Sequence, residues 1–109
     1  MVIASRSTLA EVGRLLARLR AFDPEAAARV APREAAFLSD AERWAIDPVD
    51  DTIWERCGRP FPMEPVRIMD AIHLATIEKL SAVFPRLTVL STDEQVRRNA
   101  AALGFEVRP

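Results

Sequence analysis

The chain has 109 residues, of which 50% are apolar and 28% are charged, and its net charge is -1. This length accommodates about one ordinary domain, and the composition excludes disordered and collagen-like chains. A single cysteine and a single histidine exclude disulfide scaffolds and zinc ribbons built within one chain. Because no apolar run approaches the roughly 18 residues of a membrane span and the start does not resemble a signal peptide, we expect one cytoplasmic domain over residues 1–109.

The first half of the chain is predicted to be mainly helical. A short apolar strand over Val2–Ala4 precedes a helix over Thr8–Arg20, in which leucine and valine recur at helical spacing. After Phe22-Asp23-Pro24, an alanine-rich helix is predicted to stop at Pro32, and a weaker amphipathic helix follows over 33–44. Ile46-Asp47-Pro48 is then predicted to be a break in the chain.

The second half is predicted to contain both helices and strands. A short helix over 49–57 ends at Gly58, and the most apolar stretch, 66–84, predicts a central, buried helix that Pro85 stops. A strand over 87–90, a helix over 93–103 capped by Gly104 and a strand over 105–107 follow. This strand-helix-strand order predicts a parallel sheet with helices on its faces.

Asp70 is the most informative residue, because it lies within the helix that we expect to be most buried. A carboxylate in such a place is costly to desolvate unless it meets a cation or a metal ion. A salt bridge with Arg67 or a hydrogen bond from His73, each one helical turn away, is the structural alternative.

Two further acids also have structural interpretations. Glu11 fits a capping box that starts at Thr8, or an ion pair with Arg14. Asp93 follows a strand and fits a second capping box that starts at Thr92. Taken together with Asp70, however, the two acids could converge on one rim of the sheet. Carboxylate oxygens there would suit Mg²⁺ or Mn²⁺ and phosphodiester hydrolysis.

Four segments in order resemble the PIN domain, and more narrowly the VapC-type toxins of bacterial toxin-antitoxin pairs. The most specific segment is Asp70-Ala71-Ile72-His73-Leu74-Ala75-Thr76. The others are Ser7-Thr8-Leu9-Ala10-Glu11-Val12, Val89-Leu90-Ser91-Thr92-Asp93 and Ala100-Ala101-Ala102-Leu103-Gly104.

The resemblance implies an α/β/α sandwich in three layers, with a short parallel sheet and an acidic site that cleaves RNA with Mg²⁺ or Mn²⁺. It places Glu11, Asp70 and Asp93 at metal-binding, catalytic positions. Ser91 stands where the family often has a hydroxyl that forms a hydrogen bond at the site. His73 is interpreted as a packing or supporting residue and not as a metal ligand.

The chain departs from the family at its start. Met1 lies just before what resembles the family's second strand, so we expect an N-terminally truncated fold that lacks the first strand, the helix after it and the first acid. Asp47, Asp50, Asp51 or Glu94 is left as a substitute ligand, and no spacing rule chooses among them.

Three functions follow as hypotheses. The first is a metal-dependent endoribonuclease toxin controlled by an antitoxin, in which Arg14 and Arg18 contact RNA phosphates or the antitoxin. The second is a catalytically inactive PIN remnant that binds a protein partner or forms a homodimer through its unpaired strand edges. The third is a small α/β domain without a metal site, whose acids only cap helices.

Overall fold

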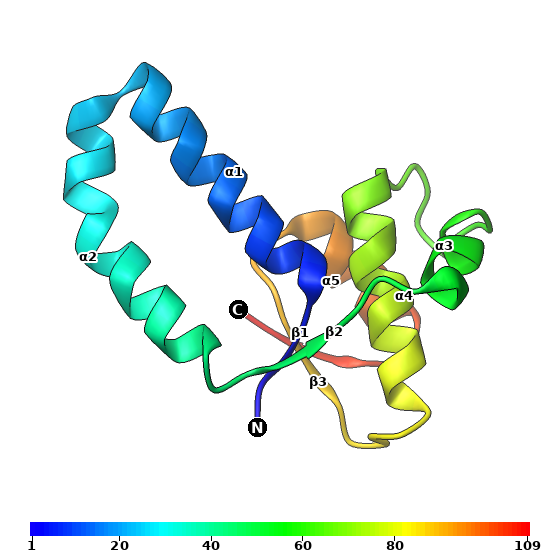
Figure 1. Ribbon diagram of the computed structural model, residues 1–109. Helices are drawn as coiled ribbons and strands as arrows, with labels where there is room; N and C mark the ends of the chain where they lie inside the picture. Colours follow the sequence, from blue (N-terminus) through cyan, green and yellow to red (C-terminus); the bar gives the residue numbers. More distant parts are fainter. The chain divides into compact units, whose positions relative to one another are not determined.

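Helices alternate with four strands of three residues along the chain, in a computed structural model that describes residues 1–109 (Figure 1). The chain divides into two compact units, Met1–Pro48 and Val49–Pro109, which we describe separately. The strands form two separate parallel pairs, one in each unit. This mixture of helices and parallel strands confirms the predicted α/β class. No helix is both long enough and apolar enough to cross a membrane.

The first unit consists of a helical hairpin and one pair of strands. Its elements are β1 (Ile3–Ser5), α1 (Arg6–Phe22), α2 (Pro24–Ala41) and β2 (Ala45–Asp47). Figure 1 shows α1 and α2 joined at a turn from which they diverge, and the chain then returns to place β2 next to β1. An ion pair of 2.5 Å between Arg20 and Glu34 links the two helices.

Helix α1 begins two residues earlier than the predicted Thr8. Ser5 is its N-cap, and the Oγ of Ser5 accepts a hydrogen bond from the backbone amide of Ser7 at 3.3 Å. Serine is a preferred N-cap because its oxygen satisfies an amide that has no partner within the helix. Since the helix has already begun at Arg6, the interpretation of Glu11 as part of a capping box that starts at Thr8 is wrong.

Helix α2 passes through Pro32, where the sequence predicts an interruption. The start of α2 has favourable capping residues. Asp23, the N-cap, accepts a hydrogen bond from the amide of Ala26 at 3.0 Å, and Pro24 occupies the first helical position. Pro32 removes one helical hydrogen bond, to the carbonyl of Ala28. Ala28 is exposed, so water can reach this part of the helix, and α2 contacts α1.

Strand β2 occupies the segment that the sequence predicts to be a break. It runs parallel to β1, with Ile3 opposite Ala45, Ala4 opposite Ile46 and Ser5 opposite Asp47. A three-residue strand with a single large apolar side chain carries almost no alternation pattern, which explains why the sequence does not reveal it.

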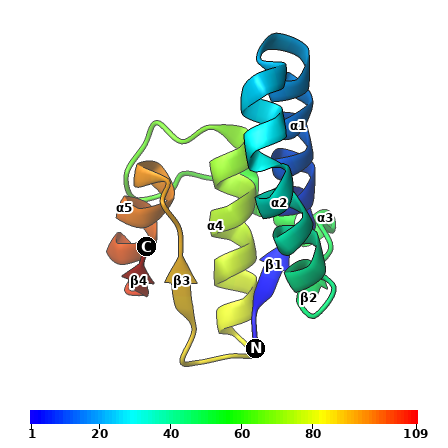
Figure 2. The same ribbon diagram turned by 90° about the vertical axis from the view of Figure 1, so that its left-hand side faces the viewer.

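The second unit is built around one buried helix. Its elements are α3 (Asp51–Cys57), α4 (Ile68–Ser81), β3 (Thr88–Leu90), α5 (Glu94–Ala102) and β4 (Glu106–Arg108). The predicted strand-helix-strand order is confirmed, because α5 connects β3 to β4 and these two strands pair in parallel (Figure 2). Gly104 follows α5 with φ of +92°, a conformation that a residue with a Cβ rarely adopts.

Helix α4 lies at the centre of the core, as its sequence predicts, and supplies four of its nine buried apolar side chains. It packs against both α3 and α5, and Leu74 at its centre is 0% exposed. All buried apolar side chains of the protein belong to this unit: Ile53, Phe61, Ala71, Ile72, Leu74, Ala75, Val89, Val96 and Ala100.

Candidate functional site

Asp70 lies in the first turn of α4 and not in the interior of the helix. The helix begins after Arg67, which as N-cap forms no side-chain hydrogen bond with the helix. A carboxylate in a first turn interacts favourably with the positive end of the helix dipole. Asp70 is therefore better tolerated by the helix than the sequence alone indicates, although its side chain is half-buried.

Asp93 is the N-cap of α5 and lies at an exposed position directly after β3. Its Oδ1 accepts a hydrogen bond from the amide of Val96 at 3.0 Å. The predicted capping box is thus wrong by one residue, because the cap is Asp93 and not Thr92. The cap uses one carboxylate oxygen, so Oδ2 is left for another ligand.

Ser91 shapes the turn that leads to Asp93. Its Oγ accepts a hydrogen bond from the amide of Asp93 at 3.1 Å, and its carbonyl accepts one from Nη1 of Arg97 at 2.9 Å. The amide of Ser91 in turn donates to the carbonyl of Arg108 in β4 at 3.1 Å. These contacts hold the turn between strand and helix, and thus the N-cap carboxylate, in one conformation.

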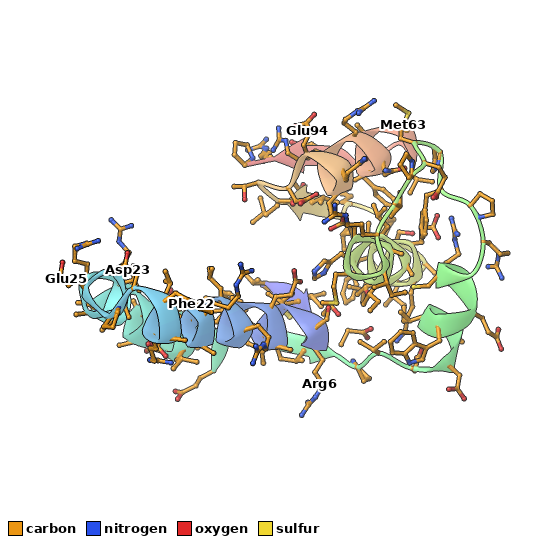
Figure 3. All side chains as sticks on the ribbon, turned by 90° about the horizontal axis from the view of Figure 1, so that it is seen from above. Arg6, Phe22, Asp23, Glu25, Met63 and Glu94 are labelled. Carbon is orange, nitrogen blue, oxygen red and sulfur yellow. The ribbon has the colours of Figure 1, made fainter.

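A hydrogen bond joins the starts of the two helices that carry these acids. Gln95, in the first turn of α5, donates from Nε2 to the carbonyl of Pro65 at 3.2 Å, and Pro65 lies three residues before α4. Figure 3 labels Met63 in the loop and Glu94 at the start of α5, on the two segments that this bond connects. The structure therefore brings the segments of Asp70 and Asp93 together within one unit.

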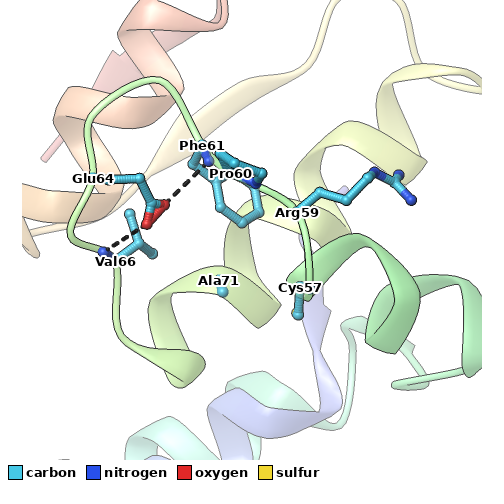
Figure 4. Close-up of a pocket in the computed structure, with 8 residues that line it drawn as sticks. Cys57, Arg59, Pro60, Phe61, Glu64, Val66 and Ala71 are labelled. Carbon is cyan, nitrogen blue, oxygen red and sulfur yellow. Dashed lines mark hydrogen bonds between the residues drawn. The ribbon is translucent and has the colours of Figure 1, made fainter.

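The loop before α4 is held by its own side chains. Glu64 accepts hydrogen bonds from the amides of Phe61 and Val66, each at 3.1 Å (Figure 4). The ring of Phe61 is buried, and the guanidinium carbon of Arg56 lies 3.8 Å from its centre.

Beside the loop is a cavity of about 320 Å³, lined by Cys57, Gly58, Arg59, Pro60, Phe61, Glu64, Val66 and Ala71. Burial raises the pKa of the Cys57 thiol, which keeps it protonated at neutral pH.

Four of the other predicted site residues lie on the first unit: Glu11, Arg14, Arg18 and Asp47. Glu11 is exposed in the second turn of α1, and Arg14 and Arg18 are exposed further along the same helix, one turn apart. Asp47 is the last residue of β2 and pairs with Ser5, the last residue of β1. It therefore lies at the carboxyl end of the strand pair, where α1 begins. The structure thus presents a carboxylate and two guanidinium groups along α1.

The donor chemistry of these acids suits a hard divalent cation, which prefers carboxylate oxygens. The structure gathers no group of three or more histidine, cysteine, aspartate or glutamate side chains that could hold a metal ion. Asp70 and Asp93 belong to the second unit and Glu11 to the first, and each of the three side chains carries carboxylate oxygens. His73 lies one turn after Asp70 on α4 and is half-buried, which is compatible with the predicted packing role.

A second cluster of charges ties α3 to α4. The hydroxyl of Thr52 donates to Oδ1 of Asp50 at 2.6 Å, Nζ of Lys79 donates to Oδ2 at 2.9 Å, and the amide of Ile53 donates at 3.1 Å. These hydrogen bonds hold the pKa of Asp50 well below its ordinary value of 3.8. Nearby, Arg56 forms a bidentate ion pair with Glu78.

This cluster predicts a specific loss of stability in acid. As the pH falls below 3.8, aspartate in the unfolded chain takes up a proton before folded Asp50 does, so the free energy of unfolding decreases. We expect Asp50→Asn, which preserves an N-cap side chain for α3, to weaken this pH dependence. Denaturant unfolding of both proteins between about pH 3 and pH 7 measures it. Asp40→Asn, which removes a more exposed ion pair, is the control. Parallel pH curves for wild type and Asp50→Asn would contradict the prediction.

Sequence reasoning missed the residues that arrange the loop. Asn99 is 0% exposed on α5, and Gln95 and Glu64 bind loop backbone atoms. The signal available for Asn99 was a polar side chain one position before Ala100 on the apolar face of a helix. A buried amide there requires partners, although the sequence does not identify them.

Comparison with protein families gives a clear match. The PIN domain family matches residues 1–102, which is nearly the whole chain. No curated protein and no solved structure gives a significant match. The matched range includes strands β1 and β3, the buried helix α4 and all three predicted acids. This chain belongs to the PIN domain family.

Proposed function

We propose that this chain is a metal-dependent endoribonuclease of the VapC toxin type, which acts in the cytoplasm and is controlled by an antitoxin. Membership in the PIN domain family, whose members are commonly nucleases, supports a nuclease-type function. The observation that carries the proposal is the juxtaposition of two acid-bearing helix starts. Asp70 lies in the first turn of α4, Asp93 is the N-cap of α5, and a hydrogen bond from Gln95 to Pro65 joins the two segments.

Each proposed residue has a defined task. Asp70, Asp93 and Glu11 provide carboxylate oxygens for Mg²⁺ or Mn²⁺, an ion that neutralises phosphate charge and acidifies water when it is bound. Ser91 orients the Asp93 cap through its hydrogen bond to the Asp93 amide. Arg14 and Arg18 are exposed and one turn apart, a spacing that suits adjacent RNA phosphates or carboxylates of an antitoxin.

The proposal is tested by cleavage of a labelled structured RNA. The full chain is incubated with Mn²⁺, and a parallel reaction contains a chelator. We expect the RNA to be cut only when Mn²⁺ is present. Equal cleavage in the chelator reaction would contradict a metal-dependent mechanism, and no cleavage by the folded chain would contradict the nuclease function.

A second candidate function is favoured by the strand edges. Each strand has one paired edge only, because both sheets contain two strands. Leu90, on β3, is 65% exposed, and an exposed apolar residue on a strand with one unpaired edge favours pairing with another chain. The chain would then be a catalytically inactive PIN domain that binds a partner protein or forms a homodimer. Sedimentation that shows a monomer over a wide concentration range would contradict homodimer formation.

A further inference from the structure

Asn99 binds a loop that is distant from it in the sequence. Its Oδ1 accepts a hydrogen bond from the amide of Met63 at 2.8 Å, and its Nδ2 donates to the carbonyl of Met63 at 3.3 Å. Nδ2 also donates to the carbonyl of Gln95, one turn earlier on α5, at 3.0 Å. The side chain is 0% exposed, so no water competes for these bonds.

This arrangement satisfies both backbone groups of Met63 with a single side chain. Within a buried environment, each of these groups would otherwise lose its hydration without compensation. The loop between α3 and α4 has no helical or strand hydrogen bonds of its own to set its path. Besides the buried ring of Phe61, the polar contacts that position it are those of Asn99 at Met63, Gln95 at Pro65 and Glu64 within the loop.

The loop leads directly into α4. Met63 lies five residues before Ile68, the first residue of that helix, and Asp70 lies in the first turn. Asn99 and Gln95 belong to α5, whose N-cap is Asp93. A contact that holds the loop on α5 thus also determines how the start of α4 is placed relative to the start of α5.

We propose that Asn99 is a positioning residue, which fixes the loop 58–67 on α5 and thereby sets Asp70 and Asp93 in register for one cation. The cation-binding part of this inference rests on the function proposed above. Asn99 contacts neither acid, so its effect on the site acts through the backbone of Met63.

The test compares Asn99→Ala with Ile53→Ala in the full chain. Ile53 is 1% exposed in α3 and none of its side-chain atoms supports the loop by a hydrogen bond, so this variant controls for a general loss of core stability. Two quantities are measured at a temperature at which both variants are folded. They are the hydrogen-exchange protection of the Met63 amide and the dissociation constant for Mn²⁺ alone.

We expect Asn99→Ala to lower protection of the Met63 amide by about tenfold or more, because its hydrogen-bond acceptor is removed. We expect its dissociation constant for Mn²⁺ to rise by about 10- to 100-fold, the range typical for residues that orient metal ligands. Ile53→Ala should raise the dissociation constant for Mn²⁺ by much less, even where it lowers the melting temperature as much as Asn99→Ala does.

The outcomes separate the two proposals. Unchanged protection at Met63, or equal weakening of Mn²⁺ binding in both variants, would overturn the positioning role while the nuclease proposal stands. No Mn²⁺ binding by the wild-type chain would overturn the cation site and with it this role of Asn99. If Asn99→Ala does not fold, Gln95→Met replaces it. That variant loses the bond to Pro65 and also a buried Oε1 atom that has no partner. Because Gln95 holds the same loop on α5, an unchanged dissociation constant for Mn²⁺ in Gln95→Met would overturn the claim that contacts between the loop and α5 set the two acids, and with it the role of Asn99.

Discussion

Replacing Asp70 with asparagine is expected to abolish Mn²⁺-dependent cleavage of RNA and to leave the chain folded. Asparagine has nearly the same shape as aspartate, but it lacks the negative charge and one of the two acceptor oxygens. A cation held by carboxylates loses its strongest attraction at this position. The loss of a first-turn charge costs the helix only about 0.3–1 kcal/mol. We therefore expect cleavage to fall below detection, while circular dichroism shows that the chain stays folded.

The matched control is Glu25→Gln. Glu25 is also an acid in the first turn of a helix, α2, and it is exposed. The substitution removes the same charge in an equivalent helical position, so it accounts for the helix-dipole effect. We expect this variant to cleave RNA at the wild-type rate. Full activity in Asp70→Asn, or an equal loss in both variants, would contradict the assignment of Asp70.

The largest expected effect on stability is that of Leu74→Ala. Leu74 is 0% exposed at the centre of α4, which packs against both α3 and α5. Truncation of a buried leucine removes apolar contacts and leaves a cavity, at a cost of about 2–5 kcal/mol. This is a large share of the roughly 5–15 kcal/mol by which small domains are stable. We expect the midpoint of chemical denaturation to fall accordingly.

Leu15→Ala provides the comparison for Leu74→Ala. Leu15 also lies in a helix, α1, but it is 57% exposed. Surface substitutions of this kind usually change the free energy of unfolding by less than about 0.5 kcal/mol. Similar losses of stability in the two variants would show that α4 is not the centre of the core.

The sequence predicts the second unit well, because its signals are local and strong. The apolar run of α4 predicts a buried helix, and Gly104 marks the end of α5 through backbone chemistry. Helix α4 ends at Ser81, however, before the predicted stop at Pro85. The parallel pairing of β3 and β4 follows from the helix between them. The PIN resemblance is confirmed by the family match, whereas the roles assigned to individual acids stay predictions.

The errors have physical causes in particular residues. Pro32 stays helical although it removes one hydrogen bond, to the carbonyl of the exposed Ala28, whereas a local rule ends the helix at every proline. Thr8 and Thr92 have good cap chemistry, but Ser5 and Asp93 lie where the chain actually turns into each helix. The loop contacts of Asn99 span 36 positions in sequence, a range over which no spacing rule operates.

The uneven distribution of burial has a thermodynamic consequence. Helices α1 and α2 contain no buried residue, whereas the second unit holds every buried apolar side chain. Local opening of the α1–α2 hairpin therefore costs less free energy than unfolding of the second unit. A partner that binds only the ordered hairpin stabilises it by mass action. The free energy of opening then rises with the logarithm of the partner's concentration. Bound RNA or antitoxin at Arg14 and Arg18 would thus protect the hairpin from proteolysis much more than it would protect the core.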